Sequence, residues 1–480
     1  MRQYLLEGPT LPPVDVFAFM IPVSLQALML HPIVPPTLSR LVRFAVMPIS
    51  LVMSFATPYR YAIEPRNQAI GVNFVVGIMG AYGIMKSIEW GLVGNLLPYT
   101  WIGFDEPSFG EKSHRSTSRD ERHAVRQEHR DHLVELRARQ AAEEGPVQIV
   151  RSTLHLMISM RGAGYQFGAI ATKPYSDQRG PYLRRLLLDI AWAHPLLVVC
   201  AMTLLEPPSN RDATLAALLP AALHLTPEQV TRIGNGVTGL AMGTAVFAAL
   251  TLGYSCAALV ALTATAISRS LPWVPEALRL PPFDPREYPP LFMLDRMPDS
   301  VAVWWSQTWH AFFARPFRFL GFKPAFRLVS PVAGKGAARA AAVLATFAVS
   351  AWIHEFGLAT AISTLPPPSE PLTFYLRWGG TIYFMMQGVA IVLEGIFQAV
   401  TGRRVGGWLG TLWMCLFVVF LGQALRDSWI EQGLLREVPP VPYWSWQRFV
   451  IPMGCLQPPP LWMSALPDFY YAERAHATFP

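Results

Sequence analysis

Hydrophobic residues lie along the chain in stretches of about 17 to 25 residues, the length at which a helix crosses the hydrocarbon core of a bilayer. Between these stretches the chain is richer in charged residues and proline. The pattern predicts eight membrane-spanning helices, at Val14–Leu30, Leu38–Thr57, Ala69–Leu92, Leu186–Leu205, Gly236–Ile267, Ala340–Thr364, Phe374–Val400 and Gly407–Leu425. The fifth is too long for one upright span, so we expect it to tilt, kink or extend past the interface.

Composition agrees with a membrane protein. Of the 480 residues 52% are hydrophobic and only 15% are charged, against about 25% charged in an average globular domain. Eighteen of the charged residues fall between Asp105 and Glu144, so the fraction of charged residues in the rest of the chain is lower still. We therefore expect an all-α, polytopic integral membrane bundle. The net charge of +7 is then no sign of nucleic-acid binding as the main activity.

Basic residues predict the orientation of the spans. The segment from Arg269 to Arg339 holds ten Lys and Arg residues against five acids, and Arg403 and Arg404 follow the seventh span. Both places lie on one side of an eight-span protein, which we assign to the cytosol. We expect one membrane domain over residues 1–480, with a charged cytosolic loop at 105–144, a cytosolic amphipathic region at 284–335 and a non-cytosolic tail at 426–480.

Metal and cofactor motifs are absent from the sequence. His129 and His132 lie one helical turn apart in a predicted helix from about Arg119 to Glu143, but no further ligands complete a metal set. Cysteine pairs with ligand spacing, nucleotide-binding glycine loops and serine-hydrolase motifs are also missing. We expect no bound metal and no resident cofactor.

An ionisable pair, His354 and Glu355, lies inside the sixth predicted span. A charged residue near the bilayer centre costs about 2.5–3.5 kcal/mol, so such residues often serve a function. Glu355 is offset by about 100° around the helix and is not expected to orient the His354 ring. The spacing fits a catalytic histidine and a histidine that hydrogen-bonds to a neighbouring helix about equally well.

A second histidine, His310, follows an aromatic stripe formed by Trp305, Trp309 and Phe312 at helical spacing. With Arg315, Arg318, Lys323 and Arg327 behind it, the stripe is typical of a helix lying in the membrane interface. That interpretation does not account for His310.

The seventh predicted span carries a polar stripe of Gln387, Glu394 and Gln398, whose directions agree within about 20° of Gln387. A glutamate inside a span is a functional candidate. A hydrogen bond between helices through Gln387 is an equally good interpretation.

Five blocks, taken in order, resemble the membrane-bound O-acyltransferase superfamily, and most of all its wax-synthase-like branch. The resemblance covers about residues 147–433. Its blocks are Met160-Arg-Gly-Ala-Gly-Tyr165, Asp284-Pro-Arg-Glu-Tyr-Pro-Pro followed by Ser300 to Trp309-His310, Ser350-Ala-Trp-Ile-His354-Glu355, Phe384-Met-Met-Gln387-Gly through Glu394, and Gly410-Thr-Leu-Trp413.

The resemblance implies a helical bundle around an internal chamber and transfer of an acyl group from acyl-CoA to a hydroxyl. His354 would match the family's buried catalytic histidine and His310 its second motif position, with Trp305, Trp309, Gln387 and Glu394 near the substrate. Related enzymes acetylate lipophilic terpenoids and meroterpenoids in secondary metabolism. We therefore expect acetyl-CoA or another acyl-CoA as co-substrate, a lipophilic alcohol as acceptor, and a location in the endoplasmic reticulum membrane.

The chain departs from the family at Ser306-Gln307-Thr308, where relatives often have one or two arginines. Contacts to the CoA phosphates would then fall to Arg315, Arg318 or Lys323. Three other functions remain open: a long-chain wax or sterol ester synthase, a transporter whose His and Glu relay protons, and an inactive scaffold.

Overall fold

A computed structural model describes residues 19–61, 70–104, 119–168, 176, 178–206, 208–219, 223–363, 368 and 370–434. In those residues the fold is helical throughout, without a strand, and Trp101 and Tyr165 form an isolated β-bridge. The all-α fold is thereby confirmed.

The N-terminal half begins with three helices and a connected pair. Helices α2 (Met20–Leu28), α3 (Pro36–Arg60) and α4 (Ile70–Leu92) pack together, and α6 (Arg119–Glu143) and α7 (Pro146–Ile158) cover one end of them. The predicted helix from Arg119 to Glu143 is confirmed. It is not wholly solvated, because the Arg137 guanidinium donates to the carbonyls of Leu30 and Leu96.

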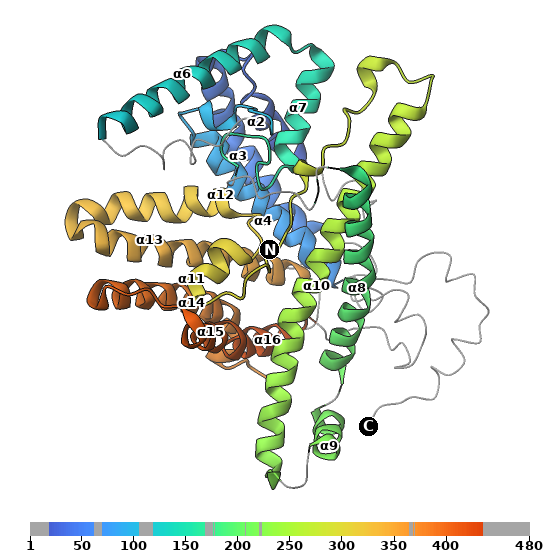
Figure 1. The fold of residues 1–480 in the computed structure, drawn as a ribbon, viewed down its shortest axis with the longest axis vertical. Helices are drawn as coiled ribbons and strands as arrows, with labels where there is room; N and C mark the ends of the chain where they lie inside the picture. Colours follow the sequence, from blue (N-terminus) through green and yellow to red (C-terminus); the bar gives the residue numbers. More distant parts are fainter. Residues whose placement is uncertain are drawn as a thin grey trace.

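The central pair runs along the long axis of the molecule (Figure 1). Helix α8 (Arg179–Leu205) packs along α10 (Pro227–Ser270), and the short α9 (Pro208–Leu218) lies between them in sequence. Helix α10 has 44 residues, so the long fifth apolar stretch forms one continuous helix. A capping box of Thr226 and Gln229 fixes its first turn.

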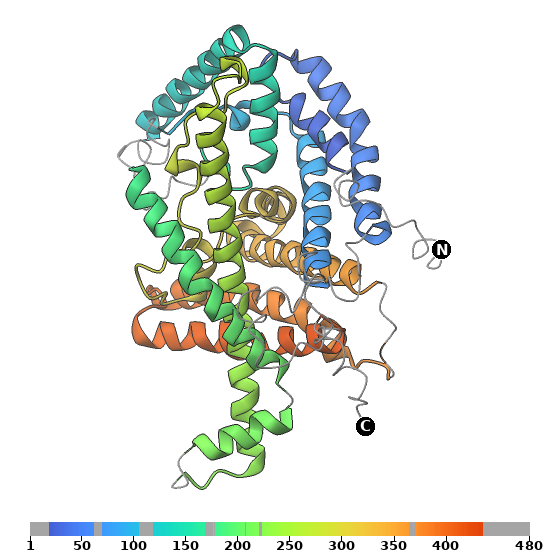
Figure 2. The ribbon, with the colours of Figure 1, turned by 90° about the vertical axis from the view of Figure 1, so that its right-hand side faces the viewer.

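The C-terminal half lies across this pair, as both views show (Figures 1 and 2). It contains α11 (Val301–Val303), a π-helical turn (Trp304–Thr308), α12 (Ala314–Phe317), α13 (Lys323–Ala361), α14 (Phe374–Thr401), α15 (Gly407–Cys415) and α16 (Gly422–Glu431). Two further π-helical turns, Arg318–Phe322 and Leu416–Phe420, join α12 to α13 and α15 to α16.

A sharp turn at Gly334 divides α13 into two antiparallel arms (Figure 1). Gly334 has a φ of 77°, which glycine adopts without steric cost. The π-helical turn just before the first arm packs against the second arm, where Gly321 lies directly against the backbone of Ala345 and Thr346. The residues just before the first arm are therefore brought beside the end of the second.

Six helices among the described residues are long and apolar enough to cross a membrane, at Pro36–Arg60, Arg179–Leu204, Pro227–Ser270, Ala314–Ala361, Phe374–Thr401 and Gly407–Glu431. Two of the eight predicted spans, the first and the third, are not among these six helices. The described part of the first stretch is helical only over Met20–Leu28, and α4 contains the buried polar residues Asn73, Lys86 and Glu89.

Candidate functional site

His354 lies on the second arm of α13, with one ring nitrogen already bonded. Its Nδ1 is 2.7 Å from the carbonyl oxygen of Ser350, one turn earlier. A carbonyl oxygen only accepts, so Nδ1 carries the proton of a neutral ring and Nε2 keeps its lone pair. The ring stacks on Phe384 of α14 at 4.3 Å between centroids and lies 6.0 Å from Trp429 of α16. Three helices thus fix a neutral imidazole with one basic nitrogen.

His310 lies near His354 because of the turn at Gly334. Phe312 and Phe313 precede the first arm and pack in one cluster with Ile353 and Phe356 of the second. The His310 ring lies 5.0 Å from that of Phe312 and 5.4 Å from that of Trp309. Its Nδ1 is buried without a hydrogen-bond partner among the described residues.

The surroundings keep His310 uncharged. Burial, with smaller contributions from the nearby His354 and Arg161, lowers the pKa of its imidazole to about 3. A neutral imidazole has one N–H donor and one acceptor nitrogen. His310 and His354 together therefore offer a base and a hydrogen-bond donor in apolar surroundings.

Glu394 of α14 fixes the start of the tryptophan segment. Its carboxylate accepts from the backbone N–H groups of Val301 and Ala302, at 2.7 and 3.1 Å, and from the indole of Trp413 at 3.0 Å. A carboxylate is favoured at a helix N-terminus, where backbone N–H groups lack internal partners. Glu394 is therefore placed to position the Trp304–Trp309 segment.

Gln387 holds the next part of that segment. Its side-chain oxygen accepts from the indole of Trp305 at 3.1 Å, and its amide donates to the carbonyl of Phe417 at 2.7 Å. Gln387 is completely buried, whereas Gln398 on the same helix is exposed. Gln387 thus forms the hydrogen bonds to other segments that were one of the two interpretations of the polar stripe.

The aromatic stripe does not form one continuous helix. The π-helical turn ends at Thr308, and Trp309 is extended, with a ψ of 156°. The Trp305 ring lies 5.7 Å from Phe347 of α13 and 6.3 Å from Phe384 of α14. The Trp305 ring therefore points into the protein. Helical spacing in the sequence does not predict these contacts.

The three basic residues predicted to bind CoA differ in their surroundings. Arg315 donates to the buried carboxylate of Glu89 at 2.6 Å and to the Tyr99 hydroxyl at 3.1 Å. Arg318 is exposed and Lys323 is half-buried. Arg315 is thus already paired inside the protein, while Arg318 and Lys323 remain the more accessible of the predicted phosphate contacts.

Sequence reasoning assigned no role to Arg161 or Trp429. Arg161 donates to the carbonyls of Pro289 and Pro290 at 3.0 and 2.9 Å, which ties the loop after α7 to the segment before Trp309. Trp429 lies beside His354, and its indole N–H is buried without a partner among the described residues. Arg161 stood inside a recognised block, whereas Trp429 lay past the end of the predicted eighth span.

Glu355 faces a different neighbour from His354. Its carboxylate accepts from the backbone N–H of Thr381 at 3.1 Å and from the Thr381 hydroxyl at 3.0 Å. It joins α13 to α14 through Thr381 and does not orient the His354 ring, whose Nδ1 is bonded to Ser350. Among the described residues no group of three or more His, Cys, Asp or Glu side chains is arranged to hold a metal ion.

A family model described as "Membrane bound O-acyl transferase family" matches residues 288–376. The matched segment contains His310, the turn at Gly334 and His354. No curated protein and no solved structure matches the chain. The family match supports membrane O-acyltransferase activity and an integral membrane protein.

Proposed function

We propose that this chain transfers an acyl group from acyl-CoA to the hydroxyl of a lipophilic alcohol at the site formed by His310 and His354. The main support is the hydrogen bond from His354 Nδ1 to the carbonyl oxygen of Ser350, because it leaves Nε2 as the basic nitrogen. The family match over the same two histidines supports this proposal independently of the geometry.

The reaction needs a base because an alcohol is a poor nucleophile at neutral pH. In our mechanism His354 Nε2 takes the hydroxyl proton while the alcohol oxygen attacks the thioester carbonyl. The neutral His310 donates a hydrogen bond to the developing oxyanion. When the C–S bond breaks, the protonated His354 returns its proton to the leaving thiolate, which gives an ester and free CoA.

The finer assignment is an acetyl group and a terpenoid or meroterpenoid acceptor in secondary metabolism, at the endoplasmic reticulum. It rests on the resemblance of the Trp-His block and the Ser350 to Glu355 block. Trp305, Trp309, Gln387 and Glu394 would shape the acceptor side. Arg318 and Lys323, with Arg315 behind them, would meet the CoA phosphates.

The deciding experiment compares membranes that contain the wild type, His354→Ala or His224→Ala. His224 is exposed, far along the chain from the site, and serves as the matched histidine control. Each receives labelled acetyl-CoA or palmitoyl-CoA with hydroxylated terpenoids and fatty alcohols. We expect ester formation by the wild type and the control, and a loss of at least a hundredfold in His354→Ala.

The donor and acceptor arms test the finer assignment. Transfer of palmitoyl and not acetyl to fatty alcohols would indicate a wax synthase in place of the acetyltransferase. Equal transfer by His354→Ala and wild type would contradict His354 as the base. Absence of ester in every arm, with protein present in the membrane, would contradict the acyltransferase itself.

A further inference from the structure

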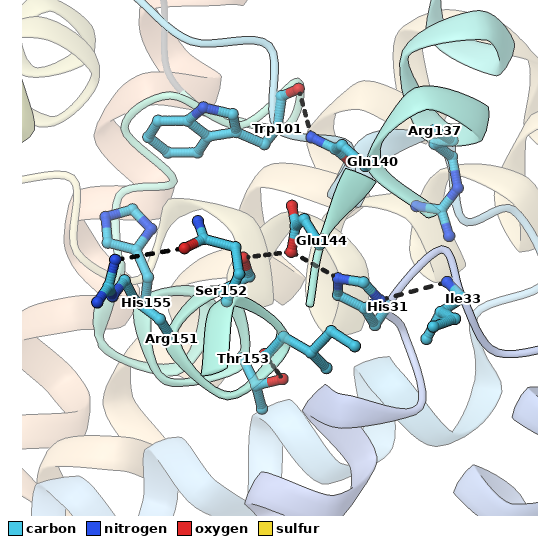
Figure 3. A network of polar contacts seen from close by, with 12 residues as sticks. His31, Ile33, Trp101, Arg137, Gln140, Glu144, Arg151, Ser152, Thr153 and His155 are labelled. Atoms are coloured by element: carbon cyan, nitrogen blue, oxygen red, sulfur yellow. Dashed lines mark hydrogen bonds and ion pairs between the residues drawn. The ribbon is translucent and has the colours of Figure 1, made fainter. Parts of the chain in front are cut away.

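A second site lies where α2, α6 and α7 meet, away from both histidines of the acyl-transfer site. It is a cavity of about 270 Å³, and its walls include neither His310 nor His354. Figure 3 shows the polar network on its walls, with Glu144 between His31 and Ser152. The volume lies just below the range of about 300–1,000 Å³ usual for drug-sized ligands, so it suits a small group.

Glu144 presents a negative charge at this cavity. One carboxylate oxygen accepts from His31 Nε2 at 2.9 Å and from the Ser152 hydroxyl at 2.8 Å. His31 Nδ1 in turn accepts from the backbone N–H of Ile33 at 3.2 Å. The His31 proton therefore resides on Nε2 and the ring is neutral, so the charge of Glu144 is not cancelled.

Glu287 brings a second carboxyl group to the wall. In the part of the chain that the structure describes, its carboxyl group has neither a hydrogen bond nor an ion pair, while its backbone N–H donates to the carbonyl of Asp284. Burial, with a smaller contribution from the charge of Asp284, raises the pKa of this carboxyl to about 7. An acid in this position is stabilised by a cation that enters the cavity.

Aromatic rings make up much of the remaining wall. The Trp101 ring stands nearly perpendicular to those of Tyr165 and His155, at interplanar angles of 82° and 84° and centroid distances of 5.2 and 5.1 Å. Tyr99 also lines the cavity. Burial lowers the pKa of His155 to about 4, so this ring is neutral at physiological pH.

Arg151 is the basic side chain on this wall, and its guanidinium is occupied. It donates to the carbonyls of Ala277 and Arg279 and to the side-chain oxygen of Gln148, at 3.3, 2.9 and 3.3 Å. With two carboxyl groups and one arginine, the cavity carries a net negative charge when both acids are ionised. This charge disfavours phosphates such as those of CoA.

We propose that the cavity binds an alkylated ammonium group, held by Glu144 and Glu287 and by the faces of the aromatic rings. Carboxylates supply charge, and aromatic rings attract cations too weakly hydrated to need hydrogen bonds. The same group occurs in free choline and in the head group of phosphatidylcholine. The proposal does not depend on acyl transfer at His354.

The test measures binding of labelled choline to the purified full chain in nanodiscs of phosphatidylglycerol. The competitors are tetramethylammonium and 3,3-dimethyl-1-butanol, the uncharged analogue of choline. We expect saturable binding that tetramethylammonium displaces and the neutral analogue does not. Displacement by both compounds alike, or absence of saturable binding in phosphatidylglycerol, would overturn the proposal.

Three variants locate the site. Glu287→Gln and Trp101→Leu should each weaken choline binding about tenfold, the effect of losing one charge or one ring contact in a desolvated site. Glu276→Gln, an exposed acid in the same region of the chain, should bind as the wild type does. Wild-type affinity in both cavity variants would contradict the assignment. Should one variant fail to fold, the other decides.

The lipid composition then identifies the source of the ammonium group. In nanodiscs of phosphatidylcholine, weaker choline binding by the wild type would indicate that the lipid head group occupies the cavity. Unchanged choline binding there would indicate a free ammonium compound. The displacement experiment with tetramethylammonium and 3,3-dimethyl-1-butanol decides whether the site exists. The lipid comparison then identifies only the source of its ligand.

Discussion

At the scale of single residues, the two histidines were visible in the sequence and their partners were not. His354 is conspicuous as an ionisable residue within a long apolar stretch, and His310 as a histidine that the aromatic stripe before it does not explain. The contacts that define their chemistry come from distant segments, such as Trp429 beside His354 and Arg161 near His310. No periodicity within one helix predicts those neighbours.

The lowered pKa of His310 predicts a loss of stability in acid. The unfolded histidine titrates near 6.5 and the folded one near 3, so between these values the unfolded state binds the extra proton. Stability contributed by the neutral ring is therefore complete above pH 6.5 and decreases as the pH falls toward 3. From pH 7 to pH 5 we expect His310 to account for a decrease of about 2 kcal/mol.

Thermal unfolding in detergent at pH 7 and pH 5 measures this effect, with His310→Phe as the comparison. Phenylalanine fills the aromatic pocket and cannot bind a proton. The variant should therefore lose less stability on acidification than the wild type. Some loss should remain, because other buried histidines such as His155 are unchanged. Equal losses in the two proteins would show that His310 does not couple folding to pH.

At the scale of elements, the sequence predicted where helices lie better than how they join. An interfacial helix was expected over Trp305, Trp309 and Phe312 because of their spacing and the basic residues behind them, but that stretch is a π-helical turn followed by an extended Trp309. The basic residues Lys323 and Arg327 lie on the first arm of α13, which the turn at Gly334 directs back along the second arm. A single backbone angle determined this arrangement, and hydrophobic patterning does not encode it.

The anchoring of the tryptophan segment by Glu394 leads to a prediction for α14. In Glu394→Gln one of the two oxygens becomes an NH₂ group, so the backbone N–H of either Val301 or Ala302 loses its acceptor and the negative charge is lost. We expect a loss of stability of about 1.5–3 kcal/mol and weaker acyl transfer through displacement of Trp305 and Trp309. Thermal unfolding and the ester assay measure the two effects.

Gln398→Ala provides the control on the same helix, because Gln398 is exposed and lies on the same predicted stripe. It should match the wild type in both measurements. If Glu394→Gln were equally unaffected, the carboxylate would not be needed to hold the tryptophan segment.

At the scale of the whole molecule, close contact between helices joins the two halves. Helices α4 and α13 cross at Gly77 and Gly357, where a Cβ on Gly77 would lie 2.1 Å from the Thr360 hydroxyl oxygen and 2.8 Å from the Gly357 Cα. Small residues permit such backbone contact between membrane helices.

Gly77→Val should therefore separate the halves. The added methyl groups meet backbone as well as side chain, so we expect a destabilisation of about 1–3 kcal/mol and reduced ester formation. Gly243→Val in α10 is the control, since a Cβ there would meet nothing within 4 Å. Comparison of the two melting temperatures in detergent checks the prediction, and equal melting temperatures would refute close packing at this crossing.

The turn at Gly334 also has a consequence for the order of folding during synthesis. Its two arms are neighbours in sequence with almost no loop between them, so bringing them together loses very little chain entropy. Contacts such as Gly321 with Ala345 are local and can form soon after both arms emerge from the ribosome. The two histidines would then already be adjacent before α14 and α16, which supply Phe384 and Trp429, have been made.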